Sequence, residues 1–166
     1  MRIVDSLIAE IDQETATTRK MLERVPADKL SWKPHEKSMT LGQLSSHVAN
    51  LVGGIAEWAA KSTMDMNDMK GPGELTSAAE LVPALEKSVA TAKKILDGMD
   101  DATVMASWSF TKDGQVMMEM PRIGLIRAIM LNHWYHHRGQ LCVYPRELDV
   151  PIPSIYGPSA DENPFA

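Results

Sequence analysis

Apolar residues recur every three or four positions along four stretches of this chain, which is the spacing of one face of an α-helix. The stretches cover residues 3–25, 40–58, 77–99 and 121–144. The last stretch is expected to end at Tyr144, because Pro145 disfavours a helical conformation in the residue before it. The pattern therefore predicts four long helices.

The connections between these stretches differ in character. Residues 62–76 contain Met, Asp, Asn, Gly and Pro without periodicity, which predicts an irregular crossover. Residues 108–111 and 116–119 flank Asp113-Gly114, a pairing typical of a small β-hairpin before the last helix. Long crossovers allow helices to run parallel, so the prediction is an all-α four-helix bundle with two long connections. At 166 residues the chain suits a single domain, 1–166.

Two histidines interrupt the predicted inward face of the last helix. This face contains Ile123, Ile126, Met130, His133, His137, Gln140 and Tyr144. Residues four apart on a helix lie on one face, so the imidazoles of His133 and His137 can converge on one metal ion.

A third metal ligand has to come from another part of the chain. His47 lies on the core face of the second predicted helix, whereas His35 lies in a polar loop bounded by prolines. We therefore predict a metal site of His47, His133 and His137, with His136 as an alternative to His137. Three imidazoles leave a coordination position open, which is typical of catalytic metal centres. Imidazole ligation suits zinc, nickel, iron or copper, and the sequence does not choose among them. We expect zinc or nickel, with iron, manganese and copper as alternatives.

Each of these polar residues also has a simpler interpretation. A single inward histidine more often makes a hydrogen bond within the core, but three on inward faces favour a common ligand. Gln140 is either a ligand contact or a bundle hydrogen bond, and Arg138 is either an anion site or a surface salt bridge. Asp161 and Glu162 are either a catalytic base or part of a solvated tail, and Cys142 is expected to serve packing alone.

Composition narrows the range of partners. The formal charge is −5 and the basic residues are scattered, which argues against nucleic acid and against an anionic membrane surface. No run of about 18 apolar residues is present to span a bilayer, and acidic residues interrupt the N-terminus. With Cys142 as its one cysteine the chain forms no internal disulfide, so a reducing cytoplasm is the expected location.

Four sequence segments together resemble the DinB/YfiT-like family of metal-dependent proteins. They are 32–34 (WKP), 40–47 (TLGQLSSH), 133–141 (HWYHHRGQL) and 155–159 (IYGPS). The resemblance covers nearly the whole chain. It implies a four-helix bundle of up-down-down-up topology, a divalent ion on the positions of His47, His133 and His137, and a homodimer.

The same resemblance implies a class of reaction. Characterised relatives include transferases and isomerases that use bacillithiol, mycothiol or related small thiols. A thiol bound to the cation would lose its proton and become a nucleophile at neutral pH. The leading expectation is a thiol-dependent S-transferase acting on a small electrophile. A non-enzymatic metal-binding or stress-response protein is the alternative, and a metal-dependent hydrolase ranks last because no carboxylate base is evident.

Overall fold

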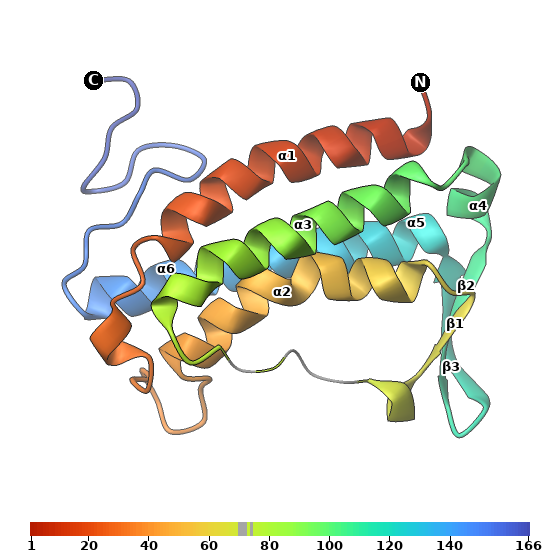
Figure 1. Ribbon diagram of the computed structural model, residues 1–166, viewed down its shortest axis with the longest axis horizontal. Coiled ribbons are helices and arrows are strands. Elements are labelled where there is room, and N and C mark those ends of the chain that lie inside the picture. Colours follow the sequence, from red (N-terminus) through yellow and green to blue (C-terminus); the bar gives the residue numbers. More distant parts are fainter. Residues whose placement is uncertain (70–72, 74) are drawn as a thin grey trace.

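The computed structural model describes residues 1–69, 73 and 75–166, and shows a mostly helical molecule with a small three-stranded sheet at one end (Figure 1). The long helices are α1 (Ile3–Leu22), α2 (Leu41–Ala59) and α3 (Leu81–Asp97), followed by a continuous run of α5 (Arg122–Gly124), η4 (Leu125–Asn132) and α6 (His133–Glu147). The short helical turns are η1 (Ala27–Lys29), η2 (Met66–Asp68), η3 (Ala78–Glu80) and α4 (Asp101–Met105). The strands are β1 (Thr63–Asp65), β2 (Ser107–Lys112) and β3 (Gln115–Pro121). No helix among the described residues is both long enough and apolar enough to cross a membrane.

The starts and ends of the first helices follow local chemistry. A capping box begins α2, because the Thr40 hydroxyl accepts from the Gln43 amide at 3.1 Å and the Gln43 side chain accepts from the Thr40 amide at 2.9 Å. Helix α1 ends at Leu22 rather than at Val25 as expected. The Val25 amide donates to the Leu22 carbonyl at 3.2 Å, so the chain tightens into a turn there while Val25 stays buried.

The sheet contains one predicted and one unpredicted pairing. Strands β2 and β3 form the expected hairpin, and Asp113 and Gly114 at its turn have φ angles of 51° and 77°, the left-handed conformation that such a turn requires. Strand β1 pairs in parallel with β2, although residues 62–76 were predicted to be irregular. Within that predicted segment, residues 70–72 and 74 lie outside the described residues.

Helices α2 and α3 approach closely at Gly53. The Gly53 amide donates to the Ser88 hydroxyl at 2.8 Å, and a Cβ built on Gly53 would lie 2.8 Å from the Ser88 carbonyl oxygen. The next residue, Gly54, is exposed, and a Cβ there would meet nothing within 4 Å. Only the first of the two glycines is therefore required for helix packing.

This contrast gives a prediction for stability. Gly53→Ala is expected to destabilise the protein by about 1–3 kcal/mol, because the added methyl group forces α3 away from α2. Gly54→Ala is expected to stabilise it by about 0.5–1 kcal/mol, since alanine is the better helix residue and has room. Urea unfolding of both variants measures the difference. Equal effects would contradict the close approach at Gly53.

The buried face of the last helical run differs from the predicted one by about one residue. It contains Ile126, Met130, Trp134, Arg138, Leu141 and Tyr144, whereas His133 and His137 are half-buried at its edge and Gln140 is exposed. The cause is the π-helical segment η4, whose wider turn brings residues four apart into line. The two histidines consequently border the core instead of lying within it.

The last helix also passes through Pro145 and ends at Glu147, beyond the predicted end at Tyr144. Proline costs one backbone hydrogen bond in the final turn, but its fixed φ is compatible with a helix. Tertiary contacts oppose that cost: the Tyr144 hydroxyl donates to the Met39 carbonyl at 3.2 Å and its ring packs edge-on against Trp32 at 5.7 Å. Tyr144 and Pro145 are both buried.

A buried ion pair joins α1 to α6. Arg138 was expected at the surface, but its side chain is 2% exposed and pairs with Glu14 at 2.6 Å. Thr18 also accepts a hydrogen bond from Arg138 at 3.1 Å. Tyr156 of the C-terminal tail donates to the Glu14 carboxylate at 2.8 Å. The tail is therefore fastened to the helices rather than solvated along its whole length, which corrects the expectation for this segment.

Candidate metal centre

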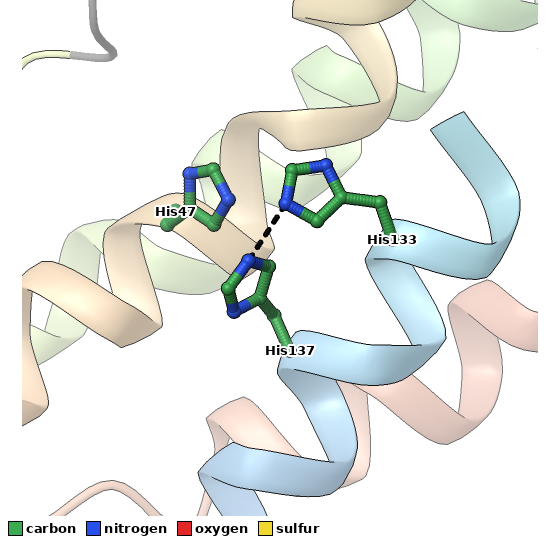
Figure 2. A group of neighbouring side chains, drawn as sticks. All are labelled: His47, His133 and His137. Atoms are coloured by element: carbon green, nitrogen blue, oxygen red, sulfur yellow. Dashed lines mark hydrogen bonds between the residues drawn. The ribbon is translucent and has the colours of Figure 1, made fainter. Parts of the chain in front are cut away.

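Two helices bring three imidazole rings together (Figure 2). His47 lies in the first half of α2, and His133 and His137 lie one turn apart at the start of α6. The ring centroid of His47 is 5.2 Å from that of His133 and 4.5 Å from that of His137. One nitrogen from each ring lies within 4.8 Å of the other two. The structure thus brings together all three residues of the predicted site.

Hydrogen bonds at the outer nitrogens orient two of the rings. Nδ1 of His133 lies 3.3 Å from the Ile129 carbonyl oxygen, and Nδ1 of His137 lies 2.7 Å from Oε1 of Gln140. Both oxygens are acceptors, so each Nδ1 carries the proton and each Nε2 presents a lone pair. Gln140, whose role the sequence left open, therefore orients His137.

The inner nitrogens of the same two rings face one another. Nε2 of His133 and Nε2 of His137 are 2.7 Å apart, which is hydrogen-bond distance, and a dashed line joins them in Figure 2. Two lone pairs at this distance repel each other unless a proton or a metal cation lies between them. The hydrogen-bond pattern thus creates a site that favours a cation.

His47 completes the donor set from the other helix. Its Nε2 is buried and has no hydrogen-bond partner among the described residues. Burial, followed by the nearby His137 and His133, lowers the pKa of His47 from 6.5 to about 4. This imidazole is therefore neutral at pH 7 and its lone pair is available to a ligand. An unpartnered buried nitrogen costs free energy, and a metal ion would remove that cost.

The donor set fits a divalent ion such as zinc. Zinc holds imidazole nitrogens at about 2.0–2.1 Å, so two nitrogens on one tetrahedral ion lie about 3.3 Å apart. The inner nitrogens of His133 and His137 would have to separate slightly from 2.7 Å, a small adjustment for two side chains. Three imidazoles and no carboxylate form the group. Such a set leaves at least one position for another ligand.

The other residues considered from the sequence lie outside this cluster. His35 is exposed in its loop, where Nδ1 accepts from the Lys37 amide at 3.2 Å. His136 is exposed and is not a member of the three-nitrogen group, so the structure does not support it in place of His137. The Cys142 thiol lies 3.5 Å from the Met21 sulfur, where burial raises its pKa, which agrees with the packing role.

The two acidic residues of the tail serve the tail itself. Asp161 accepts from the Ile152 amide at 2.8 Å and pairs with Arg146. Glu162 accepts from the Ser154 amide at 3.0 Å and pairs with Arg24 at 2.7 Å. Neither carboxylate belongs to the metal-binding group. Their use as a catalytic base has no support in the structure.

A cavity of about 980 Å³ opens beside His47 and His133 and continues along α2 to Trp58 and Lys61. The apolar pattern of the sequence did not predict this cavity. The signal that could have found it is the Gly53-Gly54 pair, which is unusual inside an apolar helix and leaves part of the surface of α2 without side chains. A small molecule in this cavity would therefore lie next to two of the imidazoles.

Protons and metal ions compete for the same ring nitrogens, which gives a pH prediction. The pKa of His47 is lowered to about 4, and burial also lowers the pKa of His137, so both lone pairs persist below the usual imidazole range. We expect the protein to keep its metal down to about pH 5, roughly one unit lower than ordinary imidazoles would allow. Metal content after dialysis at a series of pH values measures this. Loss of half the metal above pH 6.5 would contradict the lowered pKa values.

Comparisons with known proteins agree with the described architecture. The sequence model of the DinB family matches residues 2–163. An uncharacterised protein of Bacillus subtilis (strain 168), YrdA, is 25% identical over 164 residues, which are 96% of this chain and 91% of that protein. The crystal structure of the DinB-like protein YjoA from Bacillus subtilis superimposes with a TM-score of 0.71 at 19% identity, over 90% of this chain and 97% of that one. The crystal structure of a DinB-like protein from Bacillus cereus ATCC 10987 superimposes with a TM-score of 0.72 at 23% identity. The superposition covers 92% of this chain and 97% of that one.

Proposed function

Because this chain belongs to the DinB family, we propose that His47, His133 and His137 hold a divalent metal ion and that the protein transfers a low-molecular-weight thiol to an electrophile. The observation that supports the ion most directly is the group of three ring nitrogens within 4.8 Å of one another, two of which, Nε2 of His133 and Nε2 of His137, lie 2.7 Å apart. Zinc or nickel suits these donors. Two of the three histidines, His47 and His133, line the cavity, through which a thiol and its partner would enter.

The chain's own residues would prepare the site for this reaction. The bound ion would lower the pKa of a thiol next to it, so that a thiolate is present at neutral pH. Ile129 and Gln140 hold the outer nitrogens of His133 and His137, which keeps the inner nitrogens turned toward the ion. In the transfer, the sulfur forms a bond to the electrophilic carbon while that carbon loses its leaving group with the bonding electron pair. The thiol proton passes to solvent.

A hydrolase is less well supported, because activation of water requires a base close to the ion. Among the described residues, the carboxylates that line the cavity are those of Glu57 and Asp68. Glu57 lies ten residues along α2 from His47, which corresponds to about 15 Å. Asp68 lies in η2, and the group of potential metal ligands among the described residues contains no carboxylate. A thiol provides the nucleophile without such a base.

Gln140 offers a test of how the site is held. Gln140→Ala removes the acceptor that fixes the His137 ring, so metal affinity is expected to fall by about 10–100-fold while the fold remains intact. Competition with a chelating dye measures the affinity. His136→Ala is the matched control, since this exposed neighbour has no place in the group. An unchanged affinity in the Gln140 variant would show that the hydrogen bond does not orient a ligand.

The decisive experiment measures transfer directly. Metal-loaded protein is incubated with a panel of small thiols and chlorodinitrobenzene, and product is followed by absorbance. We expect a rate above that of free metal with thiol, and no enhancement with the His47→Ala protein. Rates equal to free metal and thiol would reject the transferase. Tight metal binding without activity across the panel would favour the alternative, a non-enzymatic metal-binding protein.

A further inference from the structure

The cavity beside the imidazoles is larger than a small thiol and a small electrophile require. Its volume of about 980 Å³ lies at the upper end of the range for ligand pockets, about 300–1,000 Å³. It follows α2 from His47 to Trp58, a distance of about 16 Å at the rise of an α-helix. Reactants at the histidine end would leave most of this space to another part of the substrate.

Most of the surface that lines the cavity is apolar, although polar side chains also reach it. Its apolar walls include Leu51, Ile55 and Trp58 of α2, Met64 of β1 and Ile129 of η4. Methionine and aromatic side chains adapt to apolar ligands of varied shape. Such a lining favours a hydrocarbon chain or ring over a polar group.

The charged groups that the described residues contribute to the cavity balance one another. Among residues 1–69, 73 and 75–166, Lys61 and Lys87 contribute two positive charges, and Glu57 and Asp68 contribute two negative charges. None of the four takes part in an ion pair described within residues 1–69, 73 and 75–166. A balanced set attracts neither an anion nor a cation over distance. The occupant is therefore expected to be uncharged along its length.

Gly54 leaves part of this cavity open. A glycine within a helix is less favourable than alanine, and here no neighbouring atom would meet an added Cβ within 4 Å. Packing within the chain therefore does not explain the glycine, in contrast to Gly53, which touches Ser88. A ligand that runs along α2 would explain it, because any side chain at this position would enter the cavity.

We propose that the cavity binds an elongated, uncharged apolar chain of the substrate whose reactive end lies at His47, His133 and His137. The statement about the reactive end rests on the proposed function. Binding of the apolar chain depends only on the cavity, so it is testable without metal. The substrate class is thus an alkyl or aryl compound with an apolar chain, rather than a small polar electrophile.

The first measurement uses metal-free protein and the neutral apolar dye Nile red. Gly54→Leu places a leucine in the cavity and is expected to weaken dye binding at least tenfold, at the cost of no backbone strain. Ala90→Leu is the matched control, because it adds the same side chain to an exposed position of α3 outside the cavity. Thermal unfolding confirms that both variants fold. Absence of dye binding, or equal binding by all three proteins, would overturn the proposal.

The second measurement separates this proposal from the function on which it partly rests. Cobalt-loaded protein is titrated with ethanethiol, butanethiol and hexanethiol, and thiolate binding is followed by the cobalt absorption band. In the original protein, the affinity for the thiol is expected to rise about tenfold for each two methylenes added to the thiol chain. In Gly54→Leu, the affinity is expected to be the same for all three thiols. Equal affinity for all three thiols would reject the apolar chain but leave the thiol chemistry standing. Failure of every thiol to alter the band would reject the thiol chemistry, and the dye result alone would then decide on the cavity.

Discussion

Replacing His47 by alanine is expected to lower the affinity for a divalent ion by more than about 100-fold, because it removes one of three ligands and leaves two on a single helix. Loss of a residue that merely orients a ligand already costs about 10–100-fold. The metal-free protein should be almost unaffected, since Nε2 of His47 is buried without a partner and contributes no hydrogen bond to the fold. Isothermal titration with zinc and denaturant unfolding without metal measure the two quantities.

The controls for this experiment are two other histidines. His35→Ala and His136→Ala change exposed rings outside the three-nitrogen group, so both variants should bind zinc as the original protein does. A His47 variant with the affinity of these controls would show that α2 supplies no ligand. The proposed function would fail with it, because the site would then consist of two ligands.

Replacing Arg138 by methionine is expected to lower the free energy of unfolding by about 3–5 kcal/mol. The guanidinium is 2% exposed and its partner Glu14 is 8% exposed, so the variant leaves a carboxylate buried without its counter-charge. Glu14 would keep only the hydrogen bond from Tyr156 at its carboxylate. Chemical denaturation at neutral pH measures the loss.

A double variant and an exposed pair serve as controls. Glu14→Leu combined with Arg138→Met removes both charges and should recover most of the stability, since apolar side chains of similar volume replace a buried pair well. Arg127→Met breaks a 2.6 Å pair with Glu10 in which the Arg127 side chain is 44% exposed, and should cost less than about 1 kcal/mol. A loss in Arg138→Met no larger than in Arg127→Met would contradict the importance of burial.

The long helices could be predicted because their apolar pattern persists over several turns, and the hairpin because Asp113-Gly114 specifies its turn locally. Strand β1 could not be predicted, because its three residues are too few to show an alternating apolar pattern. Its pairing also depends on Ser109, which lies far along the chain from Thr63. Arg138 was placed at the surface for the same reason: Glu14 is 124 residues away in sequence. Both the pairing of β1 and the burial of Arg138 depend on contacts between residues far apart in the sequence, which a local pattern does not contain.

Much of the candidate site could be predicted as well, because two of its histidines are four residues apart on one helix and the third lies on a core-facing helix. The orientation of the rings could not. It depends on the Ile129 carbonyl, whose position follows from the π-helical segment, and on the side-chain conformation of Gln140. Ile126, Met130 and Trp134 are apolar and each four residues apart, but this spacing also occurs on an α-helical face, so the sequence did not distinguish the wider turn.

The division of the three imidazoles between α2 and α6 has a consequence for the physiology of the protein. An ion held by both helices would act as a reversible cross-link, in a chain whose lone cysteine provides no covalent internal one. Every tenfold rise in free ion above its dissociation constant would then add about 1.4 kcal/mol to the folded state. Resistance to heat and proteolysis would follow the metal supply of the cell, so a starved cell would lose this protein first by degradation.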